Sequence, residues 1–316
     1  MSRVAAIGGG HGLARALGAL RLLGVAPTAI VTVADDGGSS GRLRRDLGII
    51  APGDLRMALL ELARQRDLAR VLAHRFDRGE LEGHALGNLL LVALAEQDGG
   101  DWVAALDRAA GLLDCAGRVL PSTSQPVALL ASTAEGVLQG QVRVTTTERA
   151  LQRVWLEPPD AVACPAAVQA LLSCDVVVLA PGSLFTSILP NLLVHGIARA
   201  VVDGGARVVY VANLATQRGE TSGLDTEGHI RALLDHVPGL VLHTVVLHDG
   251  PRVVGLGEPL GTRIDATLAG AVATADLAAR DRRGQPIAAH DPRRLADTLA
   301  GVLASAGVAG AVTTNL

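Results

Sequence analysis

Short apolar runs and longer amphipathic stretches alternate along most of the chain. Residues 12–23 place leucines on one helix face, at positions 13, 17, 20 and 23. Five runs of strand length are apolar at nearly every position, as strands of a parallel sheet buried on both faces are: "RVAAIGG", "PTAIVTVADD", "CDVVVLAPGS", "RVVYVANL" and "LHTVVLHDG". The first two runs and the helix between them form a βαβ unit. The pattern therefore predicts a doubly wound α/β fold with a mainly parallel sheet.

Three segments depart from this alternation. Residues 37–54 predict a polar loop rich in glycine, and residues 55–115 predict several helices between two strands. Residues 125–144 predict a β-hairpin, because two short apolar runs flank a glycine turn. No linker or repeat divides the chain. We therefore expect one α/β domain over residues 1–316, with a helical insertion at about 55–115 and a β-hairpin.

Two later stretches predict helices. The segment "LFTSILPNLLVHGIARAVVDGG" is largely helical in its spacing. The segment "HDPRRLADTLAGVLASAG" predicts a C-terminal helix, with Asp291 as its cap and Pro292 in its first turn.

Composition narrows the range of functions. Of the 316 residues, 49% are hydrophobic but only 2% are aromatic, so exposed rings for stacking nucleic-acid bases are scarce. The sequence contains no lysine, and this excludes a Walker A lysine, a Schiff-base lysine and a lysine general base. The net charge of -3 and the scattered arginines favour neither nucleic acid nor an acidic membrane surface as a partner.

The cysteines and the chain start bear on location. Cys115, Cys164 and Cys174 form no CxxC pair, and an odd number argues against a disulfide framework. The first strand starts too early to leave room for a signal peptide, and the apolar runs are shorter than a membrane span. We therefore expect a cytoplasmic protein without membrane insertion. The apolar helices allow a homodimer, and no feature identifies a protein partner.

The first candidate site is the turn "GGGHG" at residues 8–12. Consecutive glycines let backbone amides approach a ligand, and the start of the following helix favours an anionic group. The dinucleotide fingerprint G-x-G-x-x-G fails here, because Leu13 occupies the position of its third glycine. The turn thus predicts phosphate binding, with a tight turn that holds no ligand as the alternative.

The second candidate site is "VADDGGSSGRLRRD", residues 33–46. Asp35 and Asp36 end the second predicted strand, where an acidic residue often holds a ribose hydroxyl. Two adjacent carboxylates are also a plausible magnesium site. The glycines, the two serines and Arg42 supply donors for phosphate. A solvated turn is the alternative interpretation.

Three further segments carry polar groups after strands or at helix starts. In "APGSLFTSILPNLL", a Pro-Gly-Ser turn with Gly182, Ser183 and Thr186 predicts a second anion cradle, with simple helix capping as the alternative. In "ANLATQRGETSG", side chains including Asn213 and Gln217 are suited to reading a base or sugar. Asn88 stands near a predicted helix start, where a helix cap is an equally good interpretation.

Other common site chemistries have no support. The histidines show no zinc-ligand spacing, and ordinary structural roles are expected for His243 and His248. No G-x-S-x-G motif occurs, so a nucleophilic serine of that kind is not predicted.

Taken in order along the chain, the segments "IGGGHGL", "VADDGGSSGRLRRDLGIIAPGDLR", "HALGNLLL", "APGSLFTSILPNLLV", "NLATQRGET" and "HDPRRLA" resemble one family closely. It is the YvcK-type gluconeogenesis-factor family, within the wider CofD-like superfamily. The resemblance implies a Rossmann-like α/β fold that binds UDP-sugars, notably UDP-N-acetylglucosamine. It also implies a role in cell-wall growth and cell shape on gluconeogenic carbon sources, with no reaction firmly attached.

The resemblance also implies ligand-pocket roles for residues that match the family's motifs. These residues are Gly9, Gly10, His11, Asp35, Asp36, Ser39, Ser40, Arg42, Asn88, Ser183, Thr186 and Asn213. The chain departs from its relatives at three places. Many relatives have Thr at position 11, a Tyr within the segment aligned to 251–262, and an Arg where Ala289 precedes His290. The last two positions are linked to UDP-sugar contact in relatives, which puts ligand choice here in question.

Two other functions compete with UDP-sugar binding. Related CofD enzymes are magnesium-dependent transferases that join phospholactate to a deazaflavin, and the Asp35–Asp36 pair favours such chemistry. Nicotinamide-dependent redox chemistry lacks the third glycine of the fingerprint. NAD is therefore expected only as an adventitious ligand in a crevice suited to diphosphates.

Overall fold

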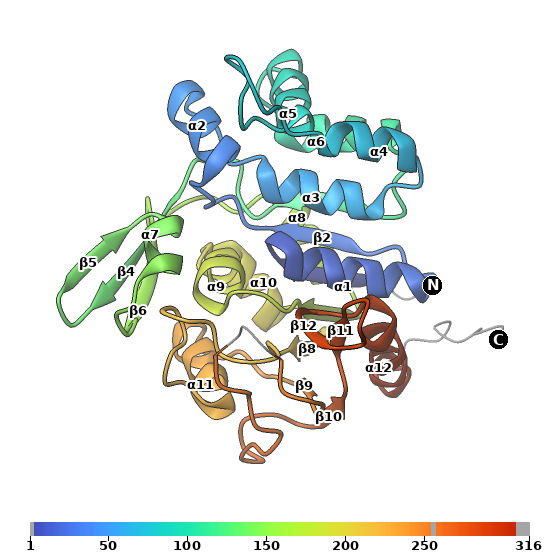
Figure 1. The fold of residues 1–316 in the computed structure, drawn as a ribbon, viewed down its shortest axis with the longest axis vertical. Coiled ribbons are helices and arrows are strands. Elements are labelled where there is room, and N and C mark those ends of the chain that lie inside the picture. The colour runs from blue at the N-terminus through green and yellow to red at the C-terminus, as the bar shows by residue number, and fades with distance from the viewer. Residues whose placement is uncertain (1–2, 254–256, 308–316) are drawn as a thin grey trace.

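A seven-stranded parallel sheet forms the centre of the molecule (Figure 1). The computed structural model describes residues 3–253 and 257–307. The strand order is β10-β9-β8-β7-β1-β2-β3, and every neighbouring pair is parallel. The strands are β1 (Val4–Gly8), β2 (Thr28–Val31), β3 (Arg118–Pro121), β7 (Val176–Leu179), β8 (Arg207–Val211), β9 (Thr244–His248) and β10 (Val272–Ala275).

The strand order reverses direction between β1 and β7, which confirms the predicted doubly wound α/β fold. In the register of the sheet, Ile7 lies beside Ile30 of β2 and Leu179 of β7. All residues of β1 and β7 are buried, because helices cover both faces of the sheet. The carboxyl ends of β1 and β7 therefore open at the same edge, at the switch point of the sheet.

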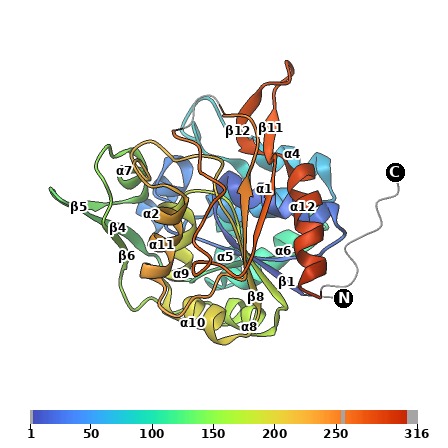
Figure 2. The ribbon, with the colours of Figure 1, turned by 90° about the horizontal axis from the view of Figure 1, so that it is seen from below.

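Helices form layers on the two faces of the sheet, as Figure 2 shows from a second side. On one face α1 packs against α3 and α12, and elsewhere α8 packs against α10. The bounds of these and the remaining covering helices are α1 (Gly10–Leu22), α3 (Gly53–Leu62), α8 (Pro165–Ser173), α9 (Leu189–Leu192), α10 (His195–Asp203), α11 (Thr226–His236) and α12 (Pro292–Ser305). The predicted cap of α12 is confirmed, since the Asp291 carboxylate accepts the N–H groups of Arg293 and Arg294.

Between β2 and β3 the chain forms a group of helices at one end of the molecule, at the top of Figure 1. Besides α3 these are α2 (Gly38–Leu47), α4 (Arg66–Ala73), α5 (Leu86–Gln97) and α6 (Trp102–Leu112). The prediction of a loop over residues 37–54 was wrong, because α2 lies within it. Leu43 is the one large apolar side chain that α2 buries, beside Ser39, Ser40 and Gly41. A buried face made of small polar residues produces no hydrophobic period.

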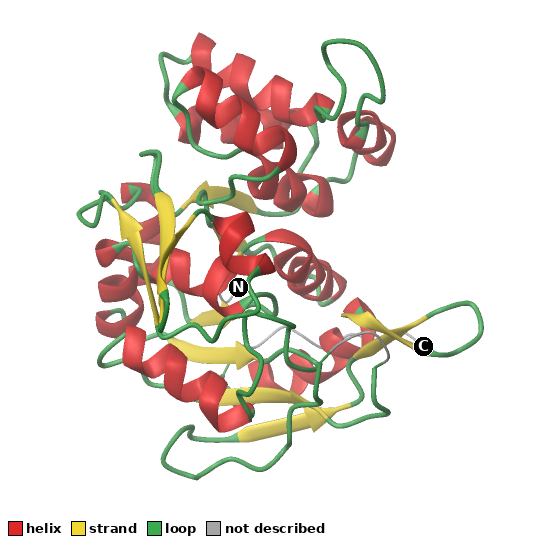
Figure 3. Cartoon of the chain, turned by 60° about the vertical axis from the view of Figure 1, so that its left-hand side comes forward, coloured by secondary structure: helices red, strands yellow, loops and turns green. Residues whose placement is uncertain are grey.

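Two small antiparallel sheets flank the large one (Figure 3). The predicted hairpin is confirmed, but its second strand ends at Gln139 and residues 141–146 are helical. Gly140 ends that strand at a φ of 101°, and the Asp36 carboxylate then accepts the N–H of Val142 at 2.9 Å. The elements are β4 (Ala128–Thr133), β5 (Gly136–Gln139), α7 (Gln141–Thr146) and β6 (Arg153–Glu157) near the hairpin, and β11 (Ala278–Arg280) and β12 (Pro286–His290) near the C-terminus.

The helical stretch after β7 is broken rather than continuous. It begins as a π-helical turn, η1 (Leu184–Ile188), continues as α9 and then bends by 78° into α10. In the described part of the chain no single helix is long and apolar enough to cross a membrane. The bent pair Leu184–Leu192 and His195–Asp203 passes that test of length and composition only when taken together.

Candidate functional site

Two turns meet at the switch point of the sheet, one after β1 and one after β7. The contact is so close that a Cβ atom on Gly12 would lie 1.9 Å from the Pro181 carbonyl oxygen. The buried Asn191 side chain reinforces it by donating to the Gly8 carbonyl at 2.9 Å. Gly10 and Gly182 adopt positive φ angles of 58° and 139°, which glycine tolerates without strain. Glycine at these positions allows the two turns to form one surface.

A cavity of about 500 Å³ opens over this surface, within the size range of small-molecule sites. Its walls come from the two turns, the loop after β8, the helix α7 and the end of β12. The lining residues are Gly9, Gly10, His11, Gly12, Arg15, Gln141, Thr145, Gly182, Ser183, Thr186, Ser187, Asn213, Leu214, Ala215, Gln217, Ala288, Ala289 and His290.

The predicted site residues divide into two groups in space. Eight of them line the cavity, namely Gly9, Gly10, His11, Gly182, Ser183, Thr186, Asn213 and Gln217. Six do not, namely Asp35, Asp36, Ser39, Ser40, Arg42 and Asn88. Segments far apart in the chain thus form one site, while no residue of the motif at residues 33–46 is among the lining residues.

Three of the six residues outside the cavity wall join α2 to other parts of the helical group. Ser39 Oγ lies 3.1 Å from His84 Nδ1 and accepts a hydrogen bond from Asn88 Nδ2 at 3.0 Å. Asn88 is therefore no helix cap, since α5 begins two residues before it and its side chain joins α5 to α2. Arg42 donates to the Glu82 carbonyl oxygen. These contacts give the residues structural roles within the helical group.

The two aspartates expected to hold magnesium are engaged by the backbone. The Asp35 carboxylate accepts the N–H of Gly37 at 3.0 Å, and the Asp36 carboxylate accepts the N–H of Val142. No group of three or more His, Cys, Asp or Glu side chains that fits a metal ion occurs within residues 3–253 and 257–307. Mg²⁺ commonly uses one or two carboxylates together with waters and substrate phosphates, so magnesium binding by Asp35 and Asp36 stays a prediction.

Asp54 is a residue of the first turn that sequence reasoning missed. Its carboxylate accepts the N–H of Gly10 and lies so close that a Cβ atom on Gly9 would be 2.5 Å from Asp54 Oδ2. Burial, with the nearby charge of Asp35, raises the pKa of Asp54 to about 7. A carboxyl group beside the first turn thus titrates near neutral pH. Its sequence context, at the start of a predicted helix, indicated only an ordinary first-turn acid.

At the second turn, Glu220 occupies the donors that we expected to hold a ligand anion. Its Oε1 accepts the N–H groups of Phe185 at 2.8 Å and Thr186 at 3.2 Å, and the hydroxyl of Ser183. Glu220 is 2% exposed, and burial raises its pKa while these three hydrogen bonds lower it. The expected second anion cradle is therefore filled by the chain itself.

The loop after β8 supplies polar groups with free hydrogen-bonding capacity. Asn213 Oδ1 accepts the N–H of Gly182 at 2.9 Å, which fixes the orientation of the side-chain amide. Asn213 Nδ2 and Gln217 Oε1 have no protein partner within the described chain. Both residues line the cavity, and their role in reading a base or a sugar stays a prediction.

The wall formed by α1, α7 and β12 contains residues that sequence reasoning missed. Arg15 carries the one fixed charge among the described lining residues, and its guanidinium suits an anionic ligand. Gln141 and Thr145 come from α7, whose first residues, 141–144, we expected to be part of the hairpin. Ala289 lines the cavity at the position where relatives are expected to carry Arg. Residues 254–256, part of the segment expected to carry a Tyr, lie outside the described residues.

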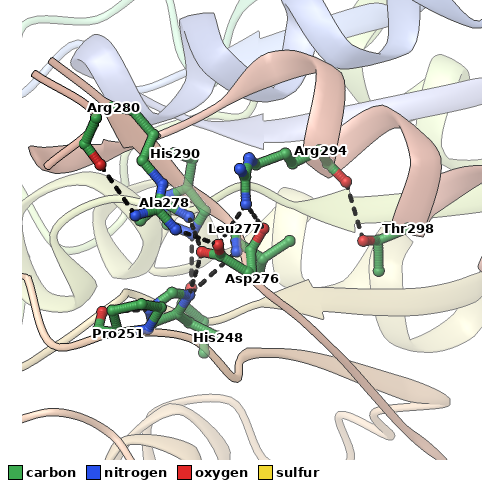
Figure 4. A network of polar contacts seen from close by, with 11 residues as sticks. His248, Pro251, Asp276, Leu277, Ala278, Arg280, His290, Arg294 and Thr298 are labelled. Carbon is green, nitrogen blue, oxygen red and sulfur yellow. Dashed lines mark hydrogen bonds and ion pairs between the residues drawn. The ribbon is translucent and has the colours of Figure 1, made fainter. Parts of the chain in front are cut away.

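His290 lines the cavity from a polar network at the end of β12 (Figure 4). Its Nε2 donates to the Ala212 carbonyl oxygen at 3.2 Å, and burial lowers its pKa to about 4. Nearby, the Asp276 carboxylate pairs with both Arg280 and Arg294 (Figure 4). The Asp276 ion pairs join β11 to α12, while burial keeps the His290 imidazole neutral at neutral pH.

The two other histidines considered from the sequence have structural roles. His243 Nδ1 accepts the N–H of Val208 at 3.0 Å, and His248 Nδ1 accepts the N–H of Leu277 at 3.1 Å. Both therefore connect strands and loops beside the large sheet.

Comparisons with known proteins agree with the fold and extend over most of the chain. The family described as 2-phospho-L-lactate transferase CofD matches residues 4–278. A relative from Mycobacterium tuberculosis is 44% identical and covers 95% of this chain and 90% of its own. The gluconeogenesis factor of Halalkalibacterium halodurans is 39% identical over 84% of this chain and 81% of its own. A crystal structure of a UPF0052 family member from Bacillus halodurans superposes with a TM-score of 0.86 at 33% identity, over 94% of this chain and 99% of that one.

Proposed function

This chain belongs to the CofD family and resembles its gluconeogenesis factors, and we propose that it is a regulatory protein that binds a UDP-sugar. UDP-N-acetylglucosamine is the proposed ligand. The proposed role is control of cell-wall growth and cell shape, in the cytoplasm, when cells grow on gluconeogenic carbon sources. The relatives named gluconeogenesis factor support this assignment.

The cavity at the switch point is the observation that carries the proposal. It combines a glycine turn at the start of α1, the guanidinium of Arg15 and the side-chain amides of Asn213 and Gln217. Unpaired amides at a helix start and an arginine suit a diphosphate, while side-chain amides suit a base or a sugar. A volume of about 500 Å³ is within the range of small-ligand pockets.

Isothermal titration calorimetry with UDP-N-acetylglucosamine tests the binding proposal. We expect saturable heat from the wild-type protein and roughly tenfold weaker binding for Arg15→Gln, because a charge-assisted contact to phosphate is lost. Arg118→Gln is a matched control, since Arg118 pairs with Asp107 and is not a lining residue. No heat at millimolar ligand would overturn the proposal.

The cellular role requires a separate test. A strain that lacks the gene is expected to lose normal shape on a gluconeogenic carbon source and to regain it with the wild-type gene but not with the Arg15→Gln variant. Normal shape of the deletion strain on that carbon source would contradict the proposed role.

A CofD-like phosphoryl transferase is the alternative, because the family match covers most of the chain. The deazaflavin chemistry of that alternative depends on magnesium, which Asp35 and Asp36 would hold together with substrate phosphates. Incubation with a nucleotide-activated lactate and the deazaflavin acceptor, followed by mass spectrometry, decides between the two. Transferase product would replace the regulatory proposal.

A further inference from the structure

The hydroxyl groups of the second turn have a defined direction. Ser183 Oγ donates its single hydrogen to Glu220 Oε1. Ser183 and Thr186 also share a hydrogen bond between their hydroxyl oxygens, so Thr186 must be its donor. Ser183 Oγ in addition accepts the N–H of Thr186 at 2.9 Å. Both hydroxyl hydrogens are therefore used in a hydrogen-bond series that runs from Thr186 through Ser183 to Glu220, and neither can be donated to a ligand in the cavity.

Glu220 ends this hydrogen-bond series, because its Oε1 atom acts only as an acceptor. It is 2% exposed, and no cationic side chain of the described chain forms an ion pair with it. Its Oε1 receives two backbone N–H groups and the hydroxyl hydrogen, while Oε2 has no protein partner within the described residues. A buried carboxylate thus draws the donors of the second turn inward.

Two residues from different loops of the cavity wall have complementary hydrogen-bonding capacity: Thr186 of the second turn and Asn213 of the loop after β8. Thr186, 3% exposed, is a lining residue, and because its hydroxyl hydrogen is used within the protein, its oxygen could act toward a ligand only as an acceptor. Asn213, 8% exposed, lines the cavity nearby and keeps Nδ2 without a partner in the described chain. A phosphate oxygen can only accept and gains nothing from Thr186. A hydroxyl group can donate to Thr186 and accept from Asn213.

We infer that Thr186, with Ser183 and Glu220 behind it, forms a subsite for a neutral hydroxyl-bearing group and keeps phosphate away from the second turn. This inference rests on the proposed binding of a nucleotide sugar and deepens it. The phosphates then lie at the first turn, beside Arg15, and either the ribose or the terminal sugar supplies the hydroxyl. Thr186 is a specificity-determining residue, and Glu220 is a positioning residue.

Calorimetry of Thr186→Val with UDP-N-acetylglucosamine over a series of salt concentrations tests the inference. Valine keeps the shape and removes the acceptor, so affinity is expected to fall roughly tenfold. The slope of affinity against salt reports charge contacts. We expect Thr186→Val to keep the wild-type slope and Arg15→Gln to flatten it. Titration with UDP separates the two hydroxyl sources: an equal loss for both ligands indicates ribose, and a loss confined to the nucleotide sugar indicates the terminal sugar.

Controls keep each outcome decisive. Thr186→Ser retains the hydroxyl and is expected to restore affinity, and Thr186→Ala replaces the valine variant if that protein does not fold. Thr133→Val removes a buried threonine hydroxyl in the β4–β5 hairpin and controls for lost stability. Unchanged affinity of Thr186→Val, or a slope flattened as in Arg15→Gln, would overturn the inference. Absence of wild-type binding would instead overturn the proposed function, and the inference with it.

Discussion

Replacing Asp54 by Asn tests whether a carboxyl group with a raised pKa lies beside the first turn. Asparagine has nearly the same shape, and its side-chain oxygen can still accept the N–H of Gly10. The substitution therefore removes the titrating charge and little else. Because Asp54 also lies beside Gly9, the result reports directly on the electrostatics of the turn.

The expected magnitude follows from the pKa of Asp54, which burial raises from 3.8 to about 7. The folded protein then binds the proton more tightly than the unfolded chain does. Below pH 3.8, the pKa of the carboxyl group in the unfolded chain, Asp54 does not lower the free energy of unfolding. Its destabilising effect grows as pH rises toward about 7. A shift of about 3 units corresponds to about 4 kcal/mol at high pH. Asp54 is partly exposed, so we expect about half of this, or ~2 kcal/mol.

Urea unfolding at about pH 4.5, 6.5 and 8.5 measures this cost. The free energy of unfolding of Asp54→Asn, relative to wild type, is expected to rise by ~2 kcal/mol across this series. Asp36→Asn is the control, because it removes one negative charge from the neighbouring loop. A difference between Asp54→Asn and wild type that stays constant with pH, or that falls as pH rises, would refute the reasoning.

Three further substitutions test packing, a buried hydrogen bond and the acid limb of stability. Gly12→Ala is expected to lower the free energy of unfolding by roughly 1–3 kcal/mol, because its Cβ atom would lie 1.9 Å from the Pro181 carbonyl oxygen; Gly111→Ala, which meets no atom within 4 Å, should cost nothing. Asn88→Ala is expected to cost roughly 1–3 kcal/mol in urea unfolding, since a buried hydrogen bond is lost; a neutral effect would contradict its role between α5 and α2. Burial lowers the pKa of His290 from 6.5 to about 4, so the unfolded chain takes up this proton first and the free energy of unfolding falls as pH drops from 6.5 through 4. The free energy of unfolding of His290→Asn should therefore fall less with decreasing pH than that of wild type, and an equal fall would contradict this.

The sequence alone determined five of the seven strands of the large sheet, whereas β3 and β10 were not predicted. Strands such as β1 and β7 are buried on both faces and therefore consist almost wholly of apolar residues, so they can be predicted from the local sequence. The turn at residues 8–12 and the Pro-Gly-Ser turn follow those strands, so their meeting at the switch point was predictable from topology. Eight of the predicted site residues line the cavity for this reason.

The tertiary structure alone decided which groups of the site are free. We expected the amides of the second turn to bind a ligand anion, but they donate to the carboxylate of Glu220, which lies more than thirty residues further along the sequence. Likewise Asp54, at the start of α3, accepts the N–H of Gly10 in the first turn. Arg15 and Ala289, which lie near opposite ends of the sequence, line the same cavity. Hydrogen-bond occupancy and pKa depend on contacts distant in sequence, and no local pattern records them.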